Sequence, residues 1–295
     1  MSVTTTSAPA AEAPDPGPSG TRRRGSRRAG RTPAPRGSVL RSTWVRAGLG
    51  LILPLLLLGR WQLLSTNGTF SEVQLPRPLA VLQAGGQLLG SGELWTHIGI
   101  STQRVVVGFV IGSLLGLAVG ALIGLSPWAS ALGSPLIGAL RAVPSLAWVP
   151  LLLLWIGIGE NSKVTLVAIG AFFPVFTTVS AALREVDRQL VEAARSFGFS
   201  GLRLLLTVQL PAVMPSVISG LRLALAQAWL FLVAAELLGS SMGLGFLLTD
   251  SQNNGRTDRL LLAIVLLAIL GKLTDALLGL FERWAQARWG AVRRA

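Results

Sequence analysis

The sequence contains no cysteine and a single histidine, His97. Without cysteine the chain can form neither a disulfide framework, nor a cysteine zinc site, nor a thiol nucleophile. One histidine cannot build a histidine-rich metal site, and no nucleophile motif accompanies it, so the sequence gives no support to Ser-His-Asp catalysis. We therefore expect no catalytic residue, no metal and no other cofactor, and we interpret His97, beside Trp95, as an interfacial polar residue.

A nucleotide-binding loop is also missing. The chain has no G-x-x-x-x-G-K-[ST] pattern, because Gly271-Lys272 is followed by Leu273 and has no glycine five residues before Gly271. Backbone N–H groups of that loop hold the phosphates of ATP in the proteins that carry it. Any ATP hydrolysis linked to this protein is therefore expected in a separate ATPase subunit.

Charge is scarce, and apolar residues are abundant. Only 13% of the residues are charged and 51% are hydrophobic, whereas soluble domains carry about 25% charge. A helix needs about 17–25 residues to cross a bilayer, and runs of this kind are too long and too continuous for barrel strands. The sequence therefore predicts an all-α polytopic membrane protein with six transmembrane helices, near 45–64, 102–125, 134–157, 163–183, 212–238 and 259–282.

The basic residues are distributed unevenly between the two sides of such a protein. With the N-terminus inside, seventeen of the 26 Lys and Arg residues lie on the cytoplasmic side and six outside, the latter including Arg104 and Lys163. Cytoplasmic segments are enriched in Lys and Arg, and the preference for arginine over lysine suggests a bacterium with a GC-rich genome. We expect a multi-pass protein of the bacterial cytoplasmic (inner) membrane, with both termini in the cytoplasm.

The N-terminal segment differs from the rest in composition. Residues 1–44 are rich in Pro, Ala, Ser, Gly and Arg, so they cannot bury enough apolar surface to fold. Nine arginines lie within the first 46 residues, and each basic residue near an anionic membrane contributes about 1 kcal/mol of attraction. We expect a disordered cytoplasmic tail whose partner is membrane lipid. Nucleic acid is the alternative partner, and we do not favour it.

A charged segment, 184–211, separates the fourth and fifth apolar runs. Asp187 can cap a helix with apolar residues on one face, and Gly198 can stop it in a left-handed conformation. Ser200 can then cap a second short helix, and Pro211 can open the next span. This pattern predicts two short helices at nearly a right angle, and periodicity alone leaves open an amphipathic loop that rests on lipid headgroups.

The spacing within this segment resembles a known signature. Glu192-Ala193-Ala194, Gly198 and Val208-Gln209-Leu210-Pro211 are similar to the EAA motif of ABC importer permeases, with Val208 where the family has Ile. The similarity runs from about 75 to 288 and is greatest to aliphatic sulfonate permeases, in the group with taurine and nitrate permeases. "LPRP" at 75–78 resembles the LPSP element of these permeases, with Arg77 in place of serine. Longer stretches that carry the resemblance are "SGELWTHIGISTQRVVVGFVIG", "LRAVPSLAWVPLLLLWIGIGENSKV", "REVDRQLVEAARSFGFSG" and "ILGKLTDALLGLFERW".

This resemblance implies a type I importer permease that carries a small anionic solute, with aliphatic sulfonates as the expected cargo. Taurine, nitrate or another small organic solute is the alternative. The implied partners are two copies of an ABC ATPase subunit, an extracytoplasmic substrate-binding protein and a second permease copy in a homodimer. The implied organisation is the tail at 1–44, a first helix at 45–64, an extracytoplasmic segment at 65–101, a core permease domain at 102–283 and a cytoplasmic tail at 284–295. The residues expected to couple the loop to the ATPase are Glu192, Ala193, Ala194, Gly198, Leu210 and Pro211.

Ionisable side chains inside the spans are costly and therefore informative. Arg141, Arg222 and Glu236 are candidates for the translocation path or its gate, and a structural role is the alternative for each. Lys272 and Asp275, three residues apart, can form an ion pair on one helix face.

Five glycines in the second run recur every fourth residue, from Gly108 to Gly124. Such a stripe lets a neighbouring backbone approach closely. We favour tight packing inside one subunit over a sliding surface between two permease halves.

The sequence gives little support to two other classes of membrane protein. An ion-coupled secondary transporter would use buried carboxylates and often has inverted repeats, but the sequence shows no internal repeat. A membrane-embedded enzyme would need clustered His, Asp or Glu near an interface, and no such cluster is apparent.

Overall fold

The computed structural model describes residues 43–144 and 147–289, with side chains over 52–144 and 147–284. The chain divides into two compact units, Met1–Leu53 and Pro54–Ala295. The first unit is described only from the beginning of α1 (Thr43–Thr66), the helix that contains the run at 45–64. The disordered tail expected at 1–44 lies outside the described residues except for its last two positions.

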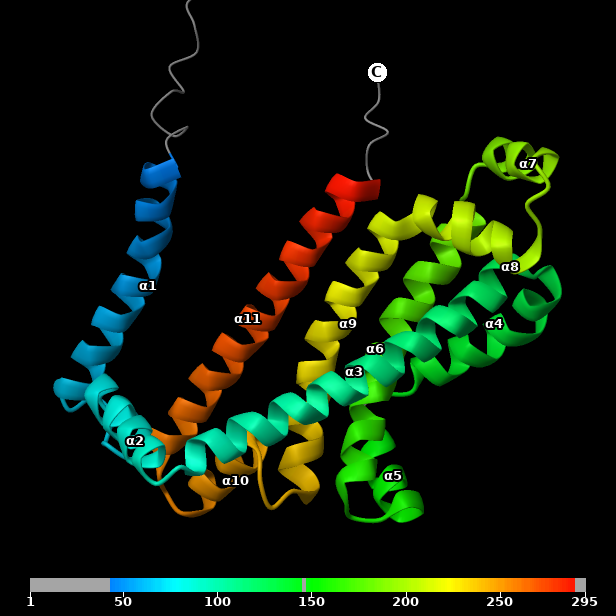
Figure 1. The fold of residues 1–295 in the computed structure, drawn as a ribbon. Helices are drawn as coiled ribbons and strands as arrows, with labels where there is room; N and C mark the ends of the chain where they lie inside the picture. Colours follow the sequence, from blue (N-terminus) through cyan, green and yellow to red (C-terminus); the bar gives the residue numbers. More distant parts are fainter. Residues whose placement is uncertain (1–42, 145–146, 290–295) are drawn as a thin grey trace, which may run out of the picture. The chain divides into compact units, whose positions relative to one another are not determined.

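The described part of the second unit consists of helices and short connections and contains no strand, which confirms the all-α prediction. Four helical segments are long and apolar enough to cross a membrane: Glu93–Leu125, Glu160–Arg184, Gly201–Gly239 and Thr257–Trp284. They match four of the predicted spans. The elements, shown in Figure 1, are α2 (Pro78–Gly90), α3 (Glu93–Leu125), α4 (Pro127–Ala142), α5 (Trp148–Ile156), α6 (Glu160–Arg184), α7 (Arg188–Ser196), α8 (Gly201–Leu204), the π-helical turn η3 (Leu205–Gln209), α9 (Leu210–Gly239), α10 (Leu244–Asn253) and α11 (Thr257–Trp289).

The prediction of a single helix over the third span, 134–157, was wrong. The structure breaks it into α4, which ends at Ala142, and α5, which begins at Trp148. Val143, directly before Pro144, is extended, with φ −67° and ψ 125°. Proline disfavours the helical conformation of the residue before it and cannot donate a backbone hydrogen bond. Hydropathy identified the apolar run but not this interruption.

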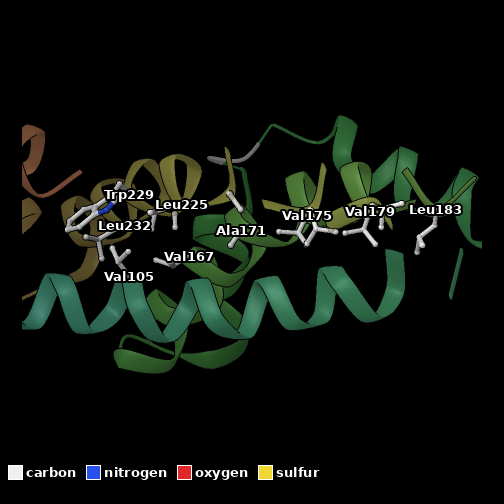
Figure 2. Packing of buried hydrophobic residues seen from close by; sticks show 13 residues of the cluster. Val105, Val167, Ala171, Val175, Val179, Leu183, Leu225, Trp229 and Leu232 are labelled. Atoms are coloured by element: carbon white, nitrogen blue, oxygen red, sulfur yellow. The ribbon is translucent and has the colours of Figure 1, made fainter. Parts of the chain in front are cut away.

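The main hydrophobic core lies where α3, α6 and α9 meet. Figure 2 shows its side chains in a row beside α3, from Trp229 and Leu232 near one end to Leu183 at the other. Val167, Ala171, Val175 and Val179 follow one another at intervals of four along α6, and each is fully buried. This spacing keeps one face of α6 in the core over most of its length.

The glycine stripe of α3 packs against α6. A Cβ at Gly108 would lie 2.6 Å from Val167 Cβ, and one at Gly116 would lie 2.8 Å from the carbonyl oxygen of Phe172. The Gly112 position is tighter still, against the carbonyl of Ala168. The stripe is therefore an internal contact within one chain, as favoured from the sequence.

Candidate functional site

The 184–211 loop begins as its sequence predicts. The Asp187 side chain caps α7 by accepting a hydrogen bond from the Gln189 N–H at 2.8 Å. Beyond α7, Gly198 has φ +83°, a conformation that side-chain-bearing residues rarely adopt. Both local signals, the cap and the left-handed stop, are confirmed.

The second half of the loop differs from the prediction. Ser200 precedes α8, but its side chain makes no capping hydrogen bond. The four-residue α8 does not end in a break; it continues through η3 into α9. The widened turn ends at Gln209, two residues before Pro211, which has no N–H to donate to the carbonyl four residues earlier. The expected separate second helix is thus the first part of one long helical segment, Gly201–Gly239.

Large apolar side chains of this loop are exposed. Phe197 is 83% exposed and Leu202 69%, while Leu190 and Leu206 are also exposed. Exposed apolar surface rimmed by polar residues marks protein–protein or membrane interaction sites. In Figure 1, α7 lies at the opposite end of α9 from α10.

The predicted coupling residues fall into two groups. Glu192 and Ala193 are exposed on α7, and the Glu192 carboxylate accepts a hydrogen bond from Arg188 Nε at 2.9 Å. Ala194 is buried, and Leu210 and Pro211 are half-buried at the start of α9, where Leu210 packs against the main core. The structure therefore places Glu192, Ala193 and Gly198 on the surface of the loop and the other three beneath it or at its base.

A cavity of about 460 Å³ lies at the break between α4 and α5. Arg141 lines it, and its Nη1 donates a hydrogen bond to Thr177 Oγ1 at 3.3 Å. The other described lining residues are Ala142, Val143, Pro144, Trp148, Ile169, Gly170, Phe173, Pro174, Thr177, Thr178, Leu223, Gln227 and Phe231.

Arg222, the second predicted path residue, is not among those lining residues. Its guanidinium contacts Asp275 at 2.9 Å and Glu282 at 3.0 Å, both on α11. These ion pairs tie α9 to α11, so the contacts favour the structural alternative for Arg222. The predicted pair of Lys272 with Asp275 is present at 3.7 Å, but Arg222 is the closer partner of that carboxylate.

Glu236, the third predicted path residue, is fully buried in an ion-pair network. Its carboxylate contacts Arg104 Nη1 at 2.6 Å and accepts hydrogen bonds from Ser101 Oγ at 2.9 Å and from the Gly245 N–H at 2.8 Å. Arg104 also contacts Glu160 at 2.6 Å, and Glu160 contacts Lys163. We call Ser101, Arg104, Glu160, Lys163 and Glu236 the buried network; it joins α3, α6 and α9, and all of its members are buried except Glu160, whose side chain is 62% exposed at its edge.

Glycines in the segment after α9 allow this network to close. Gly243 has φ +118°, and a Cβ there would meet the Glu236 carboxylate. At Gly245 a Cβ would lie 2.6 Å from Glu236 Cβ. His97 Nδ1 accepts a hydrogen bond from the Gly243 N–H at 3.0 Å and so holds the same segment.

Sequence reasoning missed the buried network because it counted Arg104 and Lys163 as outside charges. Arg104 is buried within α3, eleven residues after its start at Glu93, and Lys163 is buried near the start of α6. A signal was available, since Glu236 needed a cationic partner near the same end of the spans.

Comparison with known proteins identifies the family. The profile of the family described as "Binding-protein-dependent transport system inner membrane component" matches residues 108–286. The chain belongs to this family. It is a membrane-spanning permease of an ABC transporter and not a catalytic protein.

Individual relatives cover most of the chain. It is 43% identical over 247 residues to the putative aliphatic sulfonates transport permease protein SsuC of Escherichia coli K12, covering 83% of this chain and 93% of that protein. The SsuC protein of Bacillus subtilis 168 is 40% identical over 234 residues, covering 79% of this chain and 85% of the relative. The taurine transport system permease protein TauC of E. coli K12 is 34% identical, covering 77% and 84%.

A solved structure shares the fold. An inward-facing structure of the MetNI methionine ABC transporter matches with a TM-score of 0.58 at 22% identity, covering 65% of this chain and 95% of the matched chain. At this identity the match shows the fold, that of a type I importer permease.

Proposed function

We propose that this permease forms the path by which an ABC importer carries aliphatic sulfonates. The observation that carries the proposal is the 43% identity to an aliphatic sulfonate permease over 83% of this chain. Taurine or nitrate is the alternative cargo, because taurine and nitrate permeases of the same family also match at 34% and 33% identity. Because the chain belongs to a family of binding-protein-dependent permeases, we set aside the alternative of an ion-coupled secondary transporter.

The chain would work as a homodimer with two ATPase subunits and an extracytoplasmic binding protein that delivers the solute. Each permease copy would supply one half of the path, between the two copies. ATP binding would close the ATPase dimer and draw the two 184–211 loops together, which would turn the spans from inward- to outward-facing; hydrolysis would reset them. Both chain termini would lie in the cytoplasm.

The 184–211 loop offers the features that such docking requires. Phe197 and Leu202 present exposed apolar surface, and the Glu192–Arg188 pair presents exposed charge. Aromatic and other large apolar residues at the centre of an interface with a polar rim are typical of protein partners.

The loop is continuous with the helix α9, so α9 can transmit a movement of the loop to the cavity. Because Gly201–Gly239 is one helical segment, a displacement of its first turn is passed along α9. The same helix contributes Leu223, Gln227 and Phe231 to the cavity lining. We infer that ATPase movement at the loop would reach the cavity through α9.

Growth of a deletion strain tests the cargo. A strain that lacks this gene and has no redundant importer should fail to grow on an alkanesulfonate as sole sulfur source and should grow normally on sulfate. Normal growth on the alkanesulfonate would contradict the sulfonate assignment, while family membership would stand.

A further inference from the structure

The cavity at the α4–α5 break contains a basic side chain, Arg141, that has no counterion among the described residues. Arg104, Lys163 and Arg222 each contact a carboxylate. Arg141 differs, because its one hydrogen bond within the described residues goes to the neutral hydroxyl of Thr177. The Thr177 hydroxyl donates its proton to the carbonyl of Phe173 at 2.8 Å. Toward Arg141 its oxygen is therefore only an acceptor. An unpaired guanidinium offers a positive charge and several N–H donors, which suit an anionic ligand.

Other donors in the cavity are also unused. Gln227 and Trp148 line it, both half-buried, and neither side chain makes a hydrogen bond to any described residue. A guanidinium supplies several N–H donors in a plane, an amide supplies two and an indole one. A sulfonate has three acceptor oxygens that share one negative charge, which matches this set of donors.

The remainder of the lining is apolar. Ile169, Phe173, Leu223 and Phe231 line it, and Phe231 packs directly on Gly170, where a Cβ would lie 2.6 Å from Phe231 Cγ. Such walls favour an alkyl chain and would gain nothing from nitrate. The described lining contains no Asp or Glu to pair with the ammonium group of taurine. The cavity volume of about 460 Å³ is within the range of about 300–1,000 Å³ common for small-ligand sites.

We propose that this cavity is an organosulfonate subsite of the path, in which Arg141, Gln227 and Trp148 bind the sulfonate head and the wall that includes Phe231 binds the alkyl chain. This assignment rests on the proposed function and makes it more specific. It selects unsubstituted alkanesulfonates over taurine and nitrate at the permease itself, in addition to any selection by the binding protein.

Uptake of labelled butanesulfonate by the complete importer tests the role of the head group. The Arg141→Gln variant should lose uptake by at least about tenfold, because one charged hydrogen-bonding partner is removed. The Arg141→Lys variant keeps the charge but not the planar fork, so it should retain more uptake than Arg141→Gln. Arg60→Gln, an exposed arginine of α1 outside the cavity, is the matched control and should import at the wild-type rate. The ATPase should co-purify with all three variants.

A separate variant tests the binding of the alkyl chain of the sulfonate. Phe231→Ser should lower uptake of butanesulfonate relative to methanesulfonate, since each methylene that loses apolar contact costs about fourfold. Wild-type uptake by Arg141→Gln, or an unchanged chain-length ratio in Phe231→Ser, would overturn the subsite while leaving the importer intact. If the wild-type importer carries no sulfonate at all, the proposed function fails, and the subsite with it.

Discussion

The buried network and the 184–211 loop contain the same kinds of residue in opposite situations. In the network every charge has a partner inside the chain: Arg104 with Glu236 and Glu160, and Lys163 with Glu160. In the loop, the one pair, Arg188 with Glu192, is exposed, and Phe197 stands out from the chain. The network is complete within one chain, whereas the loop presents exposed side chains. From this difference we infer that the network holds the fold, and we propose that the loop meets another molecule.

The largest effect on folding is expected at Glu236. Glu236→Ala would leave the buried Arg104 without one of its two carboxylates, and breaking a buried pair costs about 3–5 kcal/mol. The variant should therefore be nearly absent from the membrane fraction on immunoblots. Glu236→Gln keeps the shape and can still accept a hydrogen bond, so it should accumulate to an intermediate level. Wild-type abundance of Glu236→Ala would show that the network does not hold the fold.

A smaller effect is expected in the glycine stripe. Gly112→Ala would place a Cβ against the carbonyl of Ala168, and overpacking of this kind costs about 1–3 kcal/mol. The unfolding temperature of the purified permease should fall. Gly99→Ala is the control on the same helix, because a Cβ at Gly99 meets nothing within 4 Å. Equal unfolding temperatures for the two variants would contradict the close contact between α3 and α6.

Local signals in the sequence predicted much of the fold. Long apolar runs identified the helices, and Asp187 and Gly198 fixed the start and stop of α7, because these effects depend on residues only a few positions apart. Contacts between distant residues could not be read in this way. Arg104 and Glu236 are 132 positions apart, and no local pattern links them.

Two further differences show the limits of such patterns. The run at 134–157 was predicted as one span because hydropathy averages over Pro144, where the structure separates α4 from α5. The Arg141 position was a candidate for the path, but its cavity is formed by α4, α5, α6 and α9 together, and sequence cannot show that these helices converge.

The central claim is that the 184–211 loop docks onto the ATPase, and retention of the ATPase during purification tests it most directly. Gly198→Val forces a β-branched residue into a left-handed position with φ +83°, which should misplace α7. Gly255→Val is the matched control, because Gly255 has φ +65° and, like Gly198, nothing within 4 Å of its Cβ position. Glu192→Ala should also weaken docking, by roughly ten- to a hundredfold for one charged hydrogen-bonding partner.

We predict that Gly198→Val and Glu192→Ala accumulate in the membrane as well as Gly255→Val does, but lose the ATPase on purification and lose transport, while Gly255→Val retains both. If Gly198→Val and Glu192→Ala retain the ATPase and transport at the wild-type rate, the loop only rests on lipid and the coupling role is refuted.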